Sequence, residues 1–258
     1  MFKIGYMEYA NVYPIFYYLL QDKSLYFFKS YPAELNIAMR KGEIDLSPAS
    51  CIEYARNPKL YNIISDISVS SIGAVKSVNI FSNYKVDELC GKKIFFTKES
   101  NTSTVLARII LEKFYKVEPI YVSDKNIADA ELLIGDKALY SYYNSNYKYV
   151  IDLGLEWYKF TNLPFVFALW IIRKSIENSN EIIKLISDIK EYAKKFKNNY
   201  DELAIKYMSA GYTTEQIIDY WNTIDYRLTS SHIDGLKLFY NLAYEINEIN
   251  EIPILNFY

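Results

Sequence analysis

The chain has 258 residues, of which 51% are hydrophobic and 23% are charged, a composition typical of a folded protein rather than a disordered one. Its formal net charge of −2, with acidic and basic residues interspersed, excludes the basic stripe by which proteins bind nucleic acid. No apolar segment reaches the roughly 18 residues of a membrane span, and Cys51 and Cys90 form no metal-binding or redox pair.

The first 80 residues predict strands that alternate with helices. Pro14 and Pro32 stand in the first turns of two helices, and Gly42 ends the second. Ser50 and Glu53, three residues apart, have the spacing of a capping box at the start of a third helix. The expected strands cover residues 2–6, 25–30 and 45–47 with others between 68 and 81, and the expected helices cover 14–20, 32–41 and 50–56. This alternation is typical of a parallel α/β sheet.

The chain then changes lobes near residue 82. Four further strands are expected at residues 93–97, 119–122, 131–134 and 149–152, and an amphipathic helix begins near Ser100. A strand at 165–172 leads back to the first lobe. Helices are expected near 181–197, 200–210, 213–221 and 231–246, the third with a capping box from Thr213 to Gln216. The prediction is a two-lobed α/β fold, with residues 1–82 and 173–258 in the first lobe and 83–172 in the second.

Several polar residues fall where strands lead into helices or loops. The hydroxyls of Ser100, Thr102 and Ser103 stand at a helix start, where backbone N–H groups bind anions, and from spacing alone simple helix capping is the favoured explanation. Asp136 directly follows a buried strand, and it is expected either to contact a ligand or to cap the helix that follows. His232, the one histidine, stands at the start of the last helix and is expected at the surface, so nucleophilic hydrolysis is not expected.

These segments, taken in order, resemble the chorismate dehydratase family of the futalosine route to menaquinone. The match covers about residues 1–173. The match rests on the order and spacing of its parts, which include Asn11-Val12-Tyr13-Pro14, Ser71-Ile72-Gly73-Ala74-Val75-Lys76-Ser77-Val78, Ser100-x-Thr102-Ser103, Leu133-Ile134-Gly135-Asp136 and Pro164-Phe165-Val166-Phe167. Cys51 departs from the resemblance, because a small hydroxyl residue is expected there.

The resemblance implies a fold of the type II periplasmic-binding-protein class with the ligand cleft between the lobes. It implies conversion of chorismate to 3-[(1-carboxyvinyl)oxy]benzoate with loss of water, without a metal or organic cofactor. On this basis Asn11 is the expected catalytic residue, orienting the leaving hydroxyl. The expected substrate contacts are Ser50, Ser77, Ser100, Thr102, Ser103 and Asp136.

Three alternatives remain open from the sequence. The proton-abstracting base is either a protein carboxylate, with Asp136 and Glu53 as candidates, or the enolpyruvyl carboxylate of the substrate. A solute-binding protein for a small carboxylate has the same scaffold, because function belongs to the site and not to the fold. The sister 1,4-dihydroxy-6-naphthoate synthases share the fold but need a pocket histidine. The N-terminus predicts no signal peptide, so we expect a cytoplasmic protein that binds a small molecule, without nucleic acid or membrane partners and with no expectation about its oligomeric state.

Overall fold

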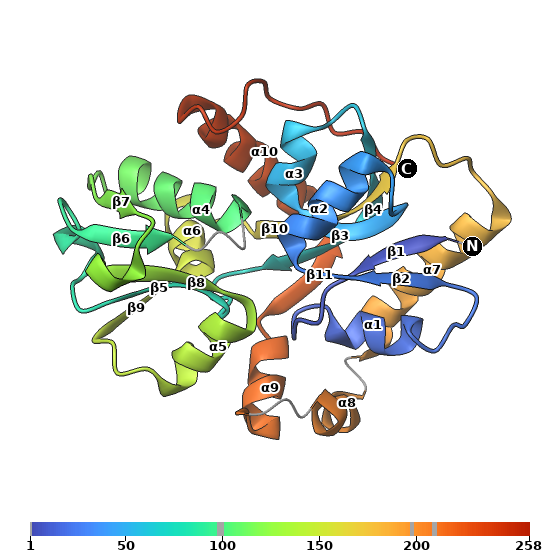
Figure 1. The fold of residues 1–258 in the computed structure, drawn as a ribbon, viewed down its shortest axis with the longest axis horizontal. Coiled ribbons are helices and arrows are strands. Elements are labelled where there is room, and N and C mark those ends of the chain that lie inside the picture. The colour runs from blue at the N-terminus through green and yellow to red at the C-terminus, as the bar shows by residue number, and fades with distance from the viewer. Residues whose placement is uncertain (1, 97–100, 197–198, 208–210) are drawn as a thin grey trace.

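The strands of the chain form two sheets that lie side by side (Figure 1). A computed structural model describes residues 2–96, 101–196, 199–207 and 211–258. The first sheet has six strands in the order β11-β4-β10-β3-β1-β2, and the second has five in the order β7-β6-β8-β5-β9. We call each sheet with its helices a lobe: the first lobe contains the six-stranded sheet and the second lobe the five-stranded one.

The N-terminal third of the first lobe follows the predicted alternation. Its elements are β1 (Lys3–Tyr6), α1 (Tyr13–Leu19), β2 (Tyr26–Lys29), α2 (Pro32–Lys41), β3 (Leu46–Ser50) and α3 (Cys51–Arg56). β1 pairs in parallel with both β2 and β3, as the alternation predicted. α2 ends at Gly42, whose φ of 77° is a left-handed conformation that favours glycine.

Three antiparallel strands complete the first sheet. They are β4 (Tyr61–Ser71), β10 (Phe165–Arg173) and β11 (Ile224–Leu228). β10 lies between β3 and β4 and pairs with both over most of its length, so the strand that returns from the second lobe becomes a central strand of the first sheet.

The second lobe contains a mixed sheet. Its strands are β5 (Val78–Ser82), β6 (Lys93–Phe96), β7 (Ile120–Val122), β8 (Ala130–Ile134) and β9 (Tyr149–Asp152). Its helices are α4 (Asn101–Arg108), which continues as a π-helix over Ile109–Phe114, α5 (Gly135–Asn144) and α6 (Leu153–Thr161), with short 3₁₀ turns at Val86–Glu88 and Lys125–Ile127. The last strand of this sheet, β9, passes directly into α6.

Within the described ranges, four helices follow β10 in sequence. They are α7 (Asn180–Lys195), α8 (Tyr200–Tyr207), α9 (Thr214–Trp221) and α10 (Ser230–Glu245), with β11 between the last two. The predicted capping box is confirmed, because Thr213 and Gln216 bond reciprocally at the start of α9. In Figure 1, α9 lies beside α5 of the second lobe, which brings the C-terminal helices to the junction of the lobes.

At both places where the chain passes between the lobes, the predicted limit differs from the residue at which the chain joins the other sheet. Val78–Ser82 pairs with β8 and β9, so the chain enters the second sheet before residue 83. Phe165–Arg173 pairs with β3 and β4, so it has returned to the first sheet before residue 173. Both crossings between the sheets therefore come several residues before the predicted lobe limits.

Two local predictions were wrong. Ser50 precedes α3, but its side chain makes no capping bond, because Ser50 is the last residue of β3 and pairs with Ala168. Glu53 is buried and accepts hydrogen bonds from Arg40 and Tyr61 instead of forming a capping box with Ser50. His232 is not at the surface: it is 1% exposed, because the first turn of α10 packs against the sheet, and its Nδ1 lies 2.8 Å from the Thr229 hydroxyl.

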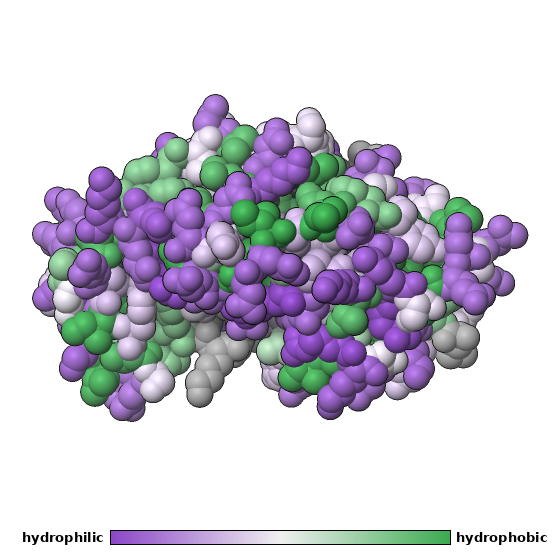
Figure 2. All heavy atoms as spheres, turned by 90° about the horizontal axis from the view of Figure 1, so that it is seen from above, coloured by the Kyte–Doolittle hydropathy of each residue, from purple (hydrophilic) through white to green (hydrophobic). Residues whose placement is uncertain are grey.

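The outer surface carries mixed chemistry. Figure 2 shows hydrophilic residues over most of the visible face, with smaller hydrophobic areas interspersed. Across the described ranges, no helix combines the length and the apolar character needed to cross a membrane.

Candidate functional site

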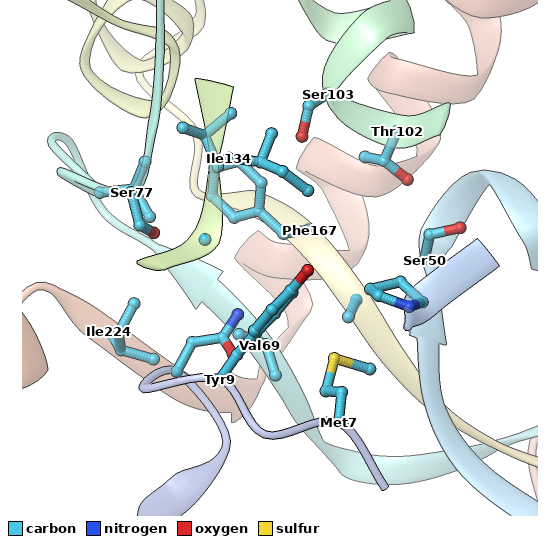
Figure 3. A pocket seen from close by; sticks show the side chains of 16 residues that line it. Met7, Tyr9, Ser50, Val69, Ser77, Thr102, Ser103, Ile134, Phe167 and Ile224 are labelled. Atoms are coloured by element: carbon cyan, nitrogen blue, oxygen red, sulfur yellow. The ribbon is translucent and has the colours of Figure 1, made fainter. Parts of the chain in front are cut away.

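A cavity lies where the two lobes meet (Figure 3). It encloses about 620 Å³, part of which is open to solvent. Both lobes contribute to its walls, and the lining consists of Met7, Tyr9, Asn11, Pro32, Ser50, Val69, Val75, Ser77, Val78, Thr102, Ser103, Ile134, Gly135, Phe167, Ala168 and Ile224. Five of the seven residues predicted for the site belong to this lining.

The lining is apolar apart from a few neutral polar groups. Among its described residues none carries a charged or imidazole side chain. The polar atoms are the hydroxyls of serine, threonine and tyrosine and the side-chain amide of Asn11. An anion bound here would therefore be held by hydroxyl and N–H donors rather than by an arginine or lysine.

The first turn of α4 supplies Thr102 and Ser103, which point into the cavity from above in Figure 3. The Thr102 hydroxyl accepts the Ile52 backbone N–H at 3.3 Å and lies 3.6 Å from the Cys51 sulfur. Thr102 thus reaches from the second lobe to the N-terminus of α3 in the first. Burial raises the pKa of the Cys51 thiol to about 12, so this sulfur stays protonated and acts as a packing group.

Ser50 faces Thr102 from the end of β3 (Figure 3). Its hydroxyl oxygen accepts a hydrogen bond from the Asn36 side-chain amide at 3.2 Å. That bond leaves the Ser50 proton able to donate into the cavity. Ser50 therefore belongs to the cavity wall, and its contact with a ligand stays a prediction.

Ser77 lies on the opposite side of the cavity, on the segment that enters the second lobe. The Tyr220 hydroxyl donates to its Oγ at 2.9 Å. The preceding Lys76 has a φ of 61°, a strained conformation for a residue with a side chain. The Asp152 carboxylate holds this segment by accepting the backbone N–H groups of Val75 and Lys76, the latter at 2.6 Å.

Asn11 lines the cavity from the loop between β1 and α1. Its backbone carbonyl accepts a hydrogen bond from Tyr226 at 2.6 Å, and the adjacent Ala10 carbonyl accepts one from the Trp221 indole at 2.8 Å. Its side-chain Oδ1 is buried and has no hydrogen-bond partner within the described part of the chain. A buried polar atom without a hydrogen-bond partner lowers the stability of the fold. The Asn11 amide oxygen is therefore suited to accept a hydrogen bond from a ligand.

Asp136 does not belong to the described lining, and it does not cap α5, whose N-cap residue is Ile134. Its Oδ1 accepts the Ala10 backbone N–H at 3.1 Å and its Oδ2 accepts the Tyr207 hydroxyl at 2.9 Å. Burial raises the pKa of this carboxyl, and these two bonds oppose the shift. The other predicted contact, Ser100, falls outside the described residues.

Sequence reasoning missed four residues of this region. Tyr9 and Phe167 line the cavity, and Figure 3 shows the phenol of Tyr9 pointing into it. Tyr220 and Asp152 hold Ser77 and its segment in place. Asp152, directly before Leu153 and Gly154, had a readable signal as a helix cap, which it is for α6. The tyrosines gave no signal, because the chain contains 27 of them.

No three His, Cys, Asp or Glu side chains come together as metal ligands anywhere in the described ranges.

Comparison with solved structures supports the predicted fold. A protein from Archaeoglobus fulgidus superposes with a TM-score of 0.77 at 21% identity, covering 96% of this chain and 98% of its own. A Candida albicans protein, described as having the generic periplasmic-binding-protein fold, superposes with a TM-score of 0.61 at 13% identity over 100% and 97% of the two chains. The two-lobed periplasmic-binding-protein-like fold is confirmed.

Sequence comparisons identify the family. The chorismate dehydratase of Thermus thermophilus is 30% identical over 191 residues, which is 66% of this chain and 69% of that protein. The chorismate dehydratase of Campylobacter jejuni is 29% identical over 171 residues, 64% of each chain. A family model described as menaquinone biosynthesis matches residues 2–245. The chain therefore belongs to the menaquinone biosynthesis family, as its resemblance to the chorismate dehydratases predicted.

Proposed function

We propose that the protein is a chorismate dehydratase, a carbon–oxygen lyase that removes water from chorismate to give 3-[(1-carboxyvinyl)oxy]benzoate. The observation that carries the proposal is a neutral cavity between two lobes, lined by hydroxyls at helix starts and by one amide with an unpaired oxygen. The similarity to chorismate dehydratases supports the choice of substrate.

Binding of the dianion is assigned to donors that carry no formal charge. The first N–H groups of a helix have no intrahelical partner, and the helix dipole adds partial positive charge there. Thr102 and Ser103 stand in the first turn of α4, and Ser50 and Ser77 face them from other walls of the cavity. We assign one carboxylate to the α4 pair and the remaining polar contacts to Ser50 and Ser77. Ser100 stays a predicted partner of the α4 pair.

The proposed reaction breaks the ring C3–H bond and the C4–O bond. The electron pair of the C3–H bond becomes the new ring π-bond, and the proton and hydroxide leave together as water. The ring carboxylate acidifies the C3 proton through the diene, and aromatisation drives the reaction. The protein then has to orient the substrate and stabilise the charge that develops during elimination.

Asn11 is assigned to the leaving hydroxyl. Its amide offers both a donor and an acceptor, and its Oδ1 is the buried, unpaired atom of the lining. Removing one such preorganised group typically lowers kcat by about 10²–10³-fold. Asn11→Ala with unchanged turnover of chorismate would remove Asn11 from the mechanism.

We assign the role of base to the enolpyruvyl carboxylate of the substrate. The described lining offers no carboxylate, lysine or histidine for this task. Glu53 is held by Arg40 and Tyr61, and Asp136 is held by Ala10 and Tyr207. A protein carboxylate facing a dianionic substrate is also electrostatically unfavourable. We further propose that the reaction occurs in the cytoplasm, as a step of the futalosine route, without a cofactor.

A solute-binding protein is the competing function, since the fold is shared with such proteins. Incubating the purified protein with chorismate and following ultraviolet absorbance separates the two. Conversion into the aromatic ether supports the dehydratase, whereas tight binding with chorismate unchanged supports the binding protein.

A further inference from the structure

The corner between β8 and α5 reaches across the cleft to the loop that carries Asn11. Gly135 has a φ of +59°, and a Cβ at this position would lie 3.3 Å from the Tyr9 ring. Next to it, Asp136 accepts hydrogen bonds from the Ala10 N–H and the Tyr207 hydroxyl. Asp136 belongs to the second lobe and Ala10 to the first, so the carboxylate joins the two lobes directly beside the cavity.

Three hydrogen bonds between side chains and the Ala10–Asn11 backbone are described. Two of them come from the first lobe and the helices that follow it: Trp221 to the Ala10 carbonyl and Tyr226 to the Asn11 carbonyl. The third, from the Ala10 N–H to Asp136, is the one that depends on the second lobe. Ala10 is 0% exposed, so water does not readily replace this acceptor while the lobes are together.

We propose that Asp136 is a positioning residue, which fixes the Ala10–Asn11 backbone across the cleft so that the Asn11 amide is in place only when the lobes are together. The inference rests on the proposed function for the role of Asn11. Each oxygen of the carboxylate holds one donor, and the residue follows Gly135 without belonging to the described lining. Asp136 therefore acts through these hydrogen bonds and not through contact with substrate or proton transfer.

Asp136→Asn is a conservative variant because an asparagine can bond to both present partners, the Ala10 N–H and the Tyr207 hydroxyl. The asparagine oxygen can accept the Ala10 N–H, and its amide N–H can donate to the phenol oxygen of Tyr207, since a phenol both donates and accepts. Asp136→Ala leaves both partners without a bond. A positioning role therefore predicts that asparagine largely rescues what alanine loses, whereas a base or a charged substrate contact predicts that both variants fail alike.

The kinetic test compares the two variants with chorismate as substrate. We expect Asp136→Ala to lower kcat by about 100-fold, the effect of a misplacement near 1 Å, with little change in KM, while Asp136→Asn retains most activity. In an Asn11→Ala background, Asp136→Ala should cause little further loss, because it acts through the same amide. Equal losses for asparagine and alanine, or additive losses with Asn11→Ala, would overturn the proposal.

A second test needs no turnover. Hydrogen–deuterium exchange of the peptide around residues 9–12 should accelerate in Asp136→Ala and stay near wild type in Asp136→Asn. Tyr212→Phe is the matched control, because Tyr212 donates at 2.5 Å to the main-chain carbonyl of Asp136 and leaves the carboxylate pair intact. Unchanged exchange in Asp136→Ala refutes the positioning role even if the proposed function is correct. If Asp136→Ala does not fold, Tyr207→Phe removes the bond that orients the second carboxylate oxygen and leaves Ala10 its acceptor. Faster exchange at residues 9–12 in this variant supports the positioning role, and unchanged exchange argues against it.

The experiments distinguish a failure of the proposed function from a failure of the positioning role of Asp136. If the wild-type protein binds chorismate without converting it, the dehydratase assignment fails, and the exchange experiment still decides whether Asp136 fixes the Asn11 loop.

Discussion

Asp152 connects the entry to the second lobe with the start of α6, and its removal is predicted to damage both. The carboxylate is 5% exposed and accepts three backbone N–H groups, from Val75, Lys76 and Leu155. Val75 lines the cavity, and Lys76, with its φ of 61°, immediately precedes Ser77. The same side chain therefore caps a helix and holds a strained segment of the cavity wall.

Asp152→Ala leaves one buried and two partly buried backbone donors without an acceptor. Each unsatisfied buried group costs about 1–3 kcal/mol, and taking the lower end for each gives a loss of about 3 kcal/mol in the free energy of unfolding. For a chain of this length each kcal/mol lowers Tm by about 2–4 °C, so we expect a decrease of roughly 6–12 °C. Ser77 should also lose its position, which raises KM for chorismate.

Urea unfolding and thermal melting measure the effect, with Asp124→Ala as the matched control. Asp124 is also a cap aspartate, but it is exposed and serves only the short turn at Lys125–Ile127, so its removal should cost no more than about 1 kcal/mol. If Asp152→Ala destabilises the protein no more than Asp124→Ala does, the three backbone bonds do not hold this segment and the reasoning is wrong.

Three further predictions concern other residues. Burial raises the pKa of Asp225, but His232, whose Nε2 lies 3.5 Å from Oδ2, and hydrogen bonds from Arg227 outweigh burial and hold the pKa below its usual value. This stabilisation is present above the unfolded pKa near 3.9 and is lost as pH falls through the folded pKa. The free energy of unfolding of Asp225→Asn should therefore depend less on pH below about 4 than that of the wild type. An unchanged pH dependence in urea titrations would contradict this. A thiol reagent at neutral pH should modify the exposed Cys90 and spare the buried Cys51 until the protein is unfolded, as mass spectrometry can show; rapid modification of both would argue against the packing around Cys51. Thr102→Val removes the acceptor of a buried backbone N–H, so it should lower the free energy of unfolding by about 1–3 kcal/mol and weaken chorismate binding. Thr102→Ser should behave like the wild type in calorimetry and in unfolding experiments.

The sequence predicted the fold because its local signals agree with the final packing. The limits of α2 follow directly from Pro32 and Gly42, and β9 occupies the predicted residues 149–152. The failures share one physical cause, which is contact between segments distant in the chain. Ser50 lost its predicted cap because β3 extends through it to pair with β10, a partner more than a hundred residues away in the chain.

The site was predictable where a residue stands at a strand end or helix start, as Thr102 and Ser103 do. It was not predictable where side chains from the C-terminal helices reach the cavity wall. Tyr220 bonds to Ser77 across 143 residues of sequence, and Tyr207 bonds to Asp136 across 71. No local pattern reports such contacts, so the position of Asp136 could be predicted and its partners could not.

The measurement that tests the central claim most directly uses chorismate deuterated at ring C3. The purified protein is incubated with it, and the products are followed by nuclear magnetic resonance and mass spectrometry. We predict 3-[(1-carboxyvinyl)oxy]benzoate that has lost the deuterium, with slower turnover than the unlabelled substrate where C–H cleavage limits the rate. Chorismate that stays intact in the complex, or a product that keeps the deuterium at C3, would contradict the account.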